Sequence, residues 1–275
     1  MNLRREIDAE EIRRLYVDEG WTMAELAEHY GCSEMTIRRR LDDLGVPTRP
    51  RGPHVSAYIA CEWSPNLAYA VGLITTDGNL SNDGRHMSVV SKDYDLLETL
   101  RDCLGIDNAI TRTTNSTGLH YNRLQWGDRN FYDWLLGIGL MPAKSLQLDS
   151  IAVPDEYMAD FMRGCIDGDG TILTYIDCYN VYKGKRYVNE RLFVSLVSAS
   201  YNFLEWLQQS VIRVTDISGA LFLHNKPTDN HAALWMLKYA KYESIRLLHW
   251  MYYSPDVPCL TRKRDKALPF LTDLE

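Results

Sequence analysis

The sequence predicts an α+β protein with two similar halves, each in the element order αββαββα, behind a small all-α domain. Three observations indicate this. One ten-residue pattern occurs twice in the 275 residues, each time at the end of a helical stretch. Each copy is followed by hairpin patterns and amphipathic helices. Capped short helices precede the first copy. The expected segments are a helical domain (residues 1–45), a linker (46–56) and the two halves (57–150 and 151–275).

The first 45 residues carry signals for three helices. AEEIRRLYVDEG is amphipathic, with Ile12, Leu15 and Tyr16 on one side. The stretch TMAELAEHYGCSEMTIRRRL follows, and its Thr22 and Glu25 have the spacing of a capping box. The side chains expected to pack between its two helices are Ala24, Leu26, Ala27, Ile37 and Leu41.

This stretch resembles a helix-turn-helix of the resolvase or sigma-factor type. Gly31 breaks the first helix and Ser33 caps the second, which would lie in the DNA major groove. A small helical bundle for protein contacts is the alternative. The outward residues of the second helix, our candidates for DNA contacts, are Glu34, Met35, Thr36, Arg38 and Arg39.

Residues 46–56, VPTRPRGPHVS, are expected to form a linker without regular structure, because they include three Pro and a Gly. Arg49 and Arg51 flank a Pro. An extended basic arm of this kind can lie in an A·T-rich minor groove. A solvated tether is the alternative interpretation.

The repeated pattern is AVGLITTDGN in the first half and MRGCIDGDGT in the second. Each copy has a Gly, an apolar pair and then an Asp-Gly whose Asp is five residues after the first Gly. Gly72 and Gly164 lie inside a helix, where Gly costs about 1 kcal/mol relative to Ala. We therefore expect a second backbone to pack closely against each of them.

The starts and ends of these two helices are also marked. Ser64 and Pro65 are typical of a first helical turn, and acidic residues follow Pro154 at the start of the other helix. Gly78 and Gly170 are expected to adopt the left-handed conformation that ends a helix.

Parallel packing of the two helices would bring Asp77 and Asp169 together at their C-terminal ends. The two carboxylates would repel each other, and each would lie at the negative end of a helix dipole. A divalent cation would resolve both problems, since carboxylate oxygens are ligands that magnesium prefers. The sequence therefore predicts Mg²⁺, or Mn²⁺, as the cofactor.

The paired pattern resembles the two motifs of the LAGLIDADG homing endonucleases, in the form where one chain carries both copies. The resemblance covers roughly residues 57–270. It implies that the motif helices form the interface between the halves. It also implies that Asp77 and Asp169 bind the metals that cut one DNA strand each, with backbone carbonyls from Thr76 and Gly168. The chain departs from the motif at Thr75, where an Asp would stand; that position is no metal ligand in the family.

The same resemblance implies metal-assisted hydrolysis of phosphodiester bonds, with a basic residue near each cleavage centre. Such a residue can stabilise the phosphorane-like charge or polarise water. Lys144 in MPAKS and Lys263 in LTRKR lie in expected loops at the ends of the halves. Arg262 and Arg264 leave the second assignment open by one residue, and surface lysines are the alternative.

The first half continues with two hairpins separated by a helix over 93–106, and a closing helix. Leu124 and Trp126 alternate with Arg123 and Gln125, so one sheet face is apolar and the other polar. The polar face would be a groove floor fit to read DNA, unless these side chains are merely solvated. The candidates for DNA contacts there are Arg85, His86, Ser88, Arg112, Arg123 and Gln125.

The second half has a long hairpin over 171–198 with a basic turn at 183–185. A basic ribbon with interleaved aromatic residues suits insertion into a DNA groove. A helix, a second hairpin and a closing helix follow. Because the halves differ in length, the DNA site need not be a perfect palindrome. The candidates on the long hairpin are Tyr175, Lys183, Lys185, Arg186 and Arg191.

Composition narrows the function classes. No apolar run reaches ~18 residues, so no membrane span is expected. Six Cys without a CxxC pair suit a reducing cytoplasm, and a DNA-binding monomer would be associated with the nucleoid. The net charge of −7 is unusual for a protein that holds duplex phosphates, so the basic residues must cluster on one face, or binding must depend strongly on low salt and metal.

The sequence therefore favours a site-specific endonuclease for double-stranded DNA, with a helix-turn-helix that lengthens its footprint. Two alternatives remain open. A transcription regulator that kept the scaffold and lost cleavage would suit the acidic charge, although both acids are retained. An intron maturase that binds RNA is the other. The target sequence cannot be read from the chain.

Overall fold

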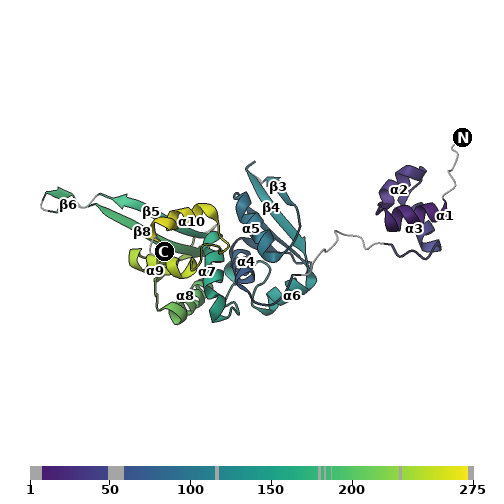
Figure 1. Ribbon diagram of the computed structural model, residues 1–275. Coiled ribbons are helices and arrows are strands. Elements are labelled where there is room, and N and C mark those ends of the chain that lie inside the picture. The colour runs from purple at the N-terminus through teal and green to yellow at the C-terminus, as the bar shows by residue number, and fades with distance from the viewer. Residues whose placement is uncertain are drawn as a thin grey trace. The chain divides into compact units, whose positions relative to one another are not determined.

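The structure is a computed structural model that describes residues 8–48, 59–114, 118–178, 181–182, 184–186, 188–228 and 231–271. The chain divides into two compact units, residues 1–54 and 55–275 (Figure 1). The expected DNA contacts at Arg49, Arg51 and Lys183, and the side chains of Lys185 and Arg186, lie outside what the structure describes.

The N-terminal unit is helical, as its capping signals predict. Its helices are α1 (Ala9–Arg13), which continues as a π-helical turn over Arg14–Asp18, α2 (Met23–Tyr30) and α3 (Glu34–Asp43). The capping box is confirmed: the Glu25 amide donates to Thr22 Oγ1 at 3.2 Å, and the Thr22 amide donates to Glu25 Oε2 at 2.7 Å. Gly31 ends α2 with a φ of 63°.

This unit has its own apolar core. Its buried members are Ile12, Leu15, Tyr16, Leu26, Ala27, Tyr30, Ile37, Leu41 and Val46. The expectation for Ala24 is wrong, because that side chain is exposed. Tyr30 packs in the core instead, and its hydroxyl donates to Glu11 at 2.9 Å.

The first half of the larger unit has the predicted αββαββα order. Its elements are α4 (Pro65–Asp77), β1 (Gly78–Leu80), β2 (His86–Ser91), α5 (Tyr94–Leu104), β3 (Ile110–Thr114), β4 (His120–Gly127) and α6 (Arg129–Gly137). The four strands form an antiparallel sheet in the order β1-β2-β4-β3. Helix α5 packs on the apolar face of β2 and β4.

The second half repeats the order with a longer hairpin (Figure 1). Its elements are α7 (Met158–Asp167), β5 (Gly170–Asp177), β8 (Asn189–Ser198), α8 (Tyr201–Thr215), β9 (Ala220–Asn225), β10 (Leu234–Tyr239) and α9 (Lys241–Met251). The antiparallel sheet order is β5-β8-β10-β9. A two-stranded ribbon, β6 (Val181–Tyr182) and β7 (Lys185–Arg186), lies in the chain between β5 and β8.

Four short helical segments complete the described part of this unit, and one corrects the sequence prediction. They are 3₁₀ turns at Lys144–Leu146, Asp155–Tyr157 and Leu268–Phe270, and helix α10 (Thr261–Ala267). Lys263 was expected in a loop, but it lies in α10. TRKRDKA has only one apolar residue, so no apolar periodicity distinguishes this helix from a loop.

The two faces of the first sheet separate as expected, with one exception. Leu124 and Trp126 are buried, whereas Gln125 on the other face is exposed. Arg112 does not belong to the polar face. It pairs with Asn122 in a register that also pairs Ile110 with Leu124, so alternation places it on the helix-covered side.

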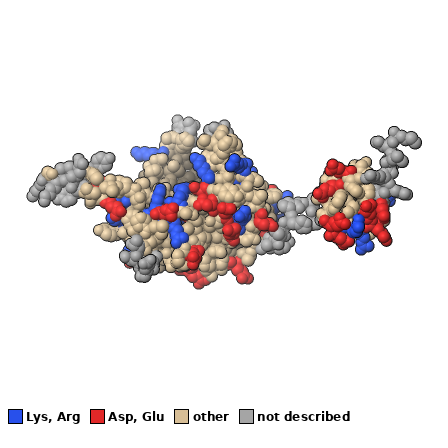
Figure 2. All heavy atoms as spheres, turned by 45° about the horizontal axis from the view of Figure 1, so that its top comes forward, with Lys and Arg blue, Asp and Glu red and all other residues tan. Residues whose placement is uncertain are grey.

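Charge is mixed over the surface. Figure 2 shows Lys and Arg interspersed with Asp and Glu on the visible face of residues 59–271, and a predominance of Asp and Glu on the N-terminal unit. The expected single basic face is therefore not evident in this view. No helix among the described residues is long and apolar enough to cross a membrane.

Candidate active site at the paired helix ends

Helices α4 and α7 lie side by side because each carries a glycine where the other backbone passes (Figure 1). A methyl group on Gly72 would lie 2.2 Å from the Phe161 carbonyl oxygen, and one on Gly164 would lie 2.2 Å from that of Tyr69. Contacts advance in the same direction along both helices, so the helices are parallel. Their C-terminal ends therefore meet.

Gly78 and Gly170, which follow the two acids, do not end their helices in the left-handed conformation that was predicted. Gly78 has a φ of −80°, and Gly170 is not among the residues with positive φ, so the left-handed prediction is wrong. A methyl group on Gly78 would lie 2.4 Å from the Ile74 carbonyl oxygen, and one on Gly170 would lie 2.5 Å from Ile166 Cα. Each glycine lets a strand turn tightly back over the last turn of its helix.

The two acids meet where the helices end. A methyl group on Gly168 would lie 2.0 Å from Thr76 Oγ1 and 3.5 Å from Asp77 Cγ, so the end of α7 touches that of α4. Burial, the negative charge of Asp169 and a hydrogen bond to Asp169 together raise the pKa of Asp77 to about 7, against the opposing charges of Lys263 and Lys144. Asp169 itself is exposed.

Two buried lysines bind the backbone around these acids. Lys263 is 5% exposed, and its Nζ donates to the carbonyls of Ile166, Asp167, Gly168 and Gly170 at 2.6–3.0 Å. Burial lowers the pKa of Lys263 to about 8. Lys144 is 8% exposed and donates to the Gly78 carbonyl. The surface-lysine alternative is therefore excluded for both.

The neighbouring arginine does not share this position. Arg262 forms a surface ion pair with Asp93, with Nη2 to Oδ2 at 2.7 Å. Lys263, in contrast, reaches the carbonyls at the end of α7.

Asp167 anchors the second motif copy through a hydrogen-bond network, and the part of the chain that the structure describes shows no equivalent at Thr75 of the first copy. Asp167 Oδ2 accepts from the Tyr69 hydroxyl at 2.9 Å and from the Leu260 amide at 2.7 Å. Burial raises the pKa of Asp167 to about 6. At the matching position Thr75 Oγ1 only donates to the Val71 carbonyl. Asp167 therefore ties α4 to the segment that leads into α10.

Sequence reasoning missed a fully buried arginine on α7. Arg163 donates through Nη1 to the Met251 carbonyl at 2.5 Å, through Nε to the Pro258 carbonyl at 2.7 Å, and through Nη2 to Asp160 at 2.5 Å. The only signal in the sequence was a charged residue beside a motif glycine in an otherwise apolar stretch. Arg163 fixes the C-terminal segment against α7.

The donor set at the helix ends suits a divalent cation. The carboxyl groups of Asp77 and Asp169 lie close together, and burial and the charge of Asp169 make Asp77 harder to ionise. The backbone carbonyls of Thr76 and Gly168 precede the two acids, although Gly168 O already accepts from Lys263 Nζ at 3.0 Å. Within the described ranges no group of three or more His, Cys, Asp and Glu is placed to hold a metal ion. Further ligands would have to be oxygens of other kinds.

Comparison with known proteins shows which solved structures have a similar fold. No protein-family model and no curated protein matches the sequence. The LAGLIDADG homing endonuclease I-LtrWI, solved bound to its target DNA, matches with a TM-score of 0.50 at 11% identity, over 75% of this chain and 89% of that one. The I-AabMI meganuclease bound to uncleaved DNA gives 0.48 at 14% identity, over 77% and 90%. Full-length DUF199/WhiA from Thermatoga maritima gives 0.46 at 11% identity, over 78% and 62%. The first similarity assigns this chain a LAGLIDADG-like α+β fold.

The residues that were expected to contact DNA differ in solvent exposure and in whether another side chain already binds them. Gln125, Arg85, Thr36 and Arg39 are exposed, whereas Arg123 and Arg38 are half-buried. Ser88 is buried. His86 is held by Asp83, with Nδ1 to Oδ2 at 2.5 Å. Arg191 is bound to Asp177 through Nε and Nη2, and Tyr175 on the same hairpin is 45% exposed.

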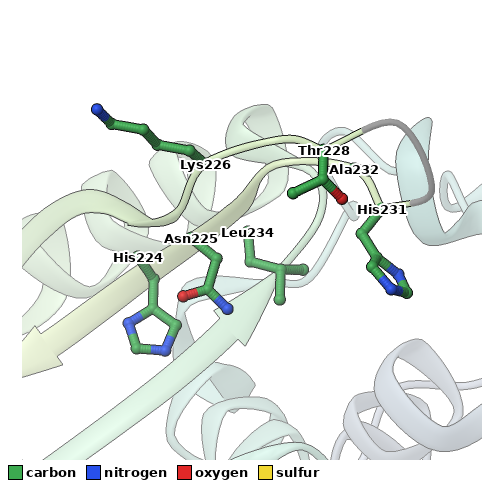
Figure 3. A pocket seen from close by; sticks show the side chains of 7 residues that line it. All are labelled: His224, Asn225, Lys226, Thr228, His231, Ala232 and Leu234. Atoms are coloured by element: carbon green, nitrogen blue, oxygen red, sulfur yellow. The ribbon is translucent and has the colours of Figure 1, made fainter.

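A separate shallow pocket of about 490 Å³ lies at the turn between β9 and β10 (Figure 3). It is lined by His224, Asn225, Lys226, Thr228, His231, Ala232 and Leu234. Figure 3 shows His224 and His231 on opposite parts of the turn, with Lys226 directed away. Its described lining residues come from the β9–β10 turn, and none of them belongs to the site at the helix ends.

Proposed function

We propose that this protein is a site-specific endonuclease that hydrolyses both strands of duplex DNA with a divalent cation, Mg²⁺ or Mn²⁺. The observation that carries the proposal is the meeting of Asp77 and Asp169 at the ends of two parallel helices, beside two buried lysines. The fold that the chain shares with DNA-bound I-LtrWI supports it.

Each residue of the site has a proposed role. Asp77 and Asp169 would hold the cation, assisted by the backbone carbonyls of Thr76 and Gly168. When bound, the cation supplies Lewis acidity that activates water and steadies the leaving 3′ oxygen. Lys144 and Lys263 keep the helix ends in place. They also add positive charge where a phosphate gains negative charge in the transition state.

The DNA would be bound by the two sheets and by the N-terminal unit. The outer sheet faces carry Arg123 and Gln125 in one half and Tyr175 and Arg191 in the other. Helix α3, through Thr36, Arg38 and Arg39, would enter a major groove as the second helix of a helix-turn-helix. Two unequal halves in one monomer fit a long, imperfectly palindromic site. Such a protein would be found on the nucleoid.

A binding selection followed by cleavage tests this proposal. Duplexes retained from a random library in EDTA are incubated with the protein in Mg²⁺ or Mn²⁺, beside the Asp77→Asn and Asp169→Asn variants. We expect cuts in both strands of the retained duplexes. Each variant should bind the same duplexes and leave at least one strand intact. Cutting that survives both substitutions would contradict the proposal.

A non-cleaving transcription regulator is the second candidate. The acidic surface of the N-terminal unit and the capped α2–α3 pair favour this candidate (Figure 2). Tight binding of one duplex class without any nicking in either metal would select this candidate. Preference for structured RNA over duplex DNA in the same assay would select an RNA maturase.

A further inference from the structure

The outer face of the second sheet, the one away from helices α8 and α9, carries a cluster of apolar side chains among polar ones. We define it by Leu173, Tyr175, Phe193, Phe222 and Met236. Register places Leu173 opposite Phe193 on β5 and β8, and Met236 opposite Phe222 on β10 and β9. Leu173 is 45% exposed and Phe222 41%. Trp235, one residue along from Met236, contacts Tyr201 of α8 instead, which fixes the two faces.

The matching face of the first sheet is mostly polar, with Val90 on β2 as an exposed apolar exception. Exposed or half-buried polar side chains occupy equivalent outward positions on β1, β3 and β4. They are Asn79, Thr111, Tyr121, Arg123 and Gln125. The two halves therefore present different chemistry to a bound molecule, although their folds are similar.

Charge on the apolar face is cationic. Lys238 Nζ lies 3.8 Å from the centre of the Phe193 ring. Among the described outward residues of strands β5, β8, β9 and β10, the acid Asp177 is paired with Arg191. The face thus combines apolar side chains with one lysine, Lys238, whose charge favours contact with an anionic partner such as the DNA backbone.

The face begins at the proposed cleavage centre. Outward residues on β5 are Thr171, Leu173 and Tyr175, at every second position after Asp169. Two residues of a strand span about 7 Å, and two base steps of a DNA strand span about the same distance. Successive outward side chains can therefore follow successive pairs of base steps away from the cut.

We propose that the second sheet recognises thymine methyl groups in the major groove, so that its half-site is A·T-rich while the other half-site is read by hydrogen bonds. This inference rests on the proposed function. The C5-methyl of thymine is the one apolar group that the major groove presents. Leu173, Phe193, Phe222 and Met236 can bury it, and polar side chains cannot.

The test uses the full chain and the random duplex library. Retained duplexes should be enriched in thymine on one side of the centre only. Replacing those thymines by deoxyuridine removes only the methyl group, and it should weaken binding roughly fourfold per contacted base. Gln125→Ala should change preference on the opposite side of the centre.

Matched variants locate the effect on one face. Leu173→Ser and Phe222→Ser should reduce the preference for thymine over deoxyuridine to about onefold at their positions, because serine has no methyl group to contact thymine. Ile176→Ser and Leu223→Ser, exposed on the other side of the same two strands, should retain it. All four positions are at least 38% exposed, so the variants should fold, and thermal unfolding checks this.

Three outcomes would overturn the inference. If the protein binds duplexes that contain thymine and duplexes that contain deoxyuridine with equal affinity, the inference is wrong and the proposed function is unaffected. Concentration-dependent dimers in sedimentation without DNA, abolished by Leu173→Ser, would assign the face to self-association. Failure to retain any duplex would overturn both this inference and the proposed function.

Discussion

At the scale of single residues, burial and the nearby charge of Asp169 make the Asp77 carboxyl group harder to ionise. Asp77 is half-buried beside Asp169, and its pKa of about 7 lies above the usual carboxyl range near 4. The folded protein therefore binds more protons than the unfolded chain between about pH 4 and pH 7. The stability that comes from neutral Asp77 is complete below about pH 4 and is lost as the pH rises through 7.

This predicts an unusual response to Asp77→Asn. In EDTA at pH 8 the variant should be about 2–4 kcal/mol more stable than the wild type, because the buried charge is gone. The difference should shrink toward pH 4. Urea unfolding at both pH values measures it. In the wild type at pH 8, Mg²⁺ should restore stability by binding the folded state. Equal stabilities of the two proteins at both pH values would contradict the ionisation argument.

The two lysines differ in the number of carbonyls that they hold. Lys263 donates to four backbone carbonyls and Lys144 to one that the structure describes. A buried carbonyl left without a donor costs about 1–3 kcal/mol. Lys263→Met should therefore destabilise the protein by roughly 3 kcal/mol or more, and Lys144→Met by about half as much or less. Urea unfolding of both variants measures the two losses of stability. A larger loss for Lys144→Met than for Lys263→Met would contradict the carbonyl contacts assigned to Lys263.

At the scale of elements, the pairing of α4 and α7 depends on two glycines that have no room for a side chain. Gly72→Ala places a methyl group 2.2 Å from a backbone oxygen, so the helices must separate. We expect a loss of about 3 kcal/mol or more. Gly137→Ala is the matched control, because that glycine ends α6 with no atom near its missing side chain. The control should gain about 0.5–1 kcal/mol.

Thermal unfolding compares the two alanine variants, and separation of the helices also has a functional readout. Gly72→Ala should lower divalent-cation affinity, measured by calorimetry, because the acids move apart. An alanine at position 72 with wild-type stability and cation affinity would show that the helices do not depend on this contact.

Elements with a strong apolar period were predicted well from sequence, and those without one were not. The hairpins and the amphipathic helix α5 (Tyr94–Leu104) follow their patterns. Helix α10 was missed because its buried residue at position 263 is a lysine, which reads as solvent-facing. The face of Arg112 was misjudged because only the register with β4 fixes which side of β3 is covered.

At the scale of the whole molecule, the two units have separate cores. The core of residues 55–275 runs from Ile59 to Leu271 and includes no residue of the N-terminal unit. Residues 55–275 alone should therefore fold with cooperative unfolding near that of the full chain. Binding to selected duplexes should weaken, with a shorter footprint and a smaller salt dependence, because the contacts of α3 are gone. Denaturation and footprinting test this; an unchanged footprint would argue against DNA contact by α3.

The sequence by itself determined the repeated motif, the glycines of the helix pair, the capped N-terminal helices and the alternation of the first sheet. These follow from local rules, since caps, turns and periodicity act over a few residues. Only the tertiary structure decided that Lys263 reaches four carbonyls, that Arg163 and Asp167 anchor the second copy, and that the second sheet has an apolar outer face. Those features join residues up to about a hundred positions apart, and their energies depend on burial and register that no local pattern encodes.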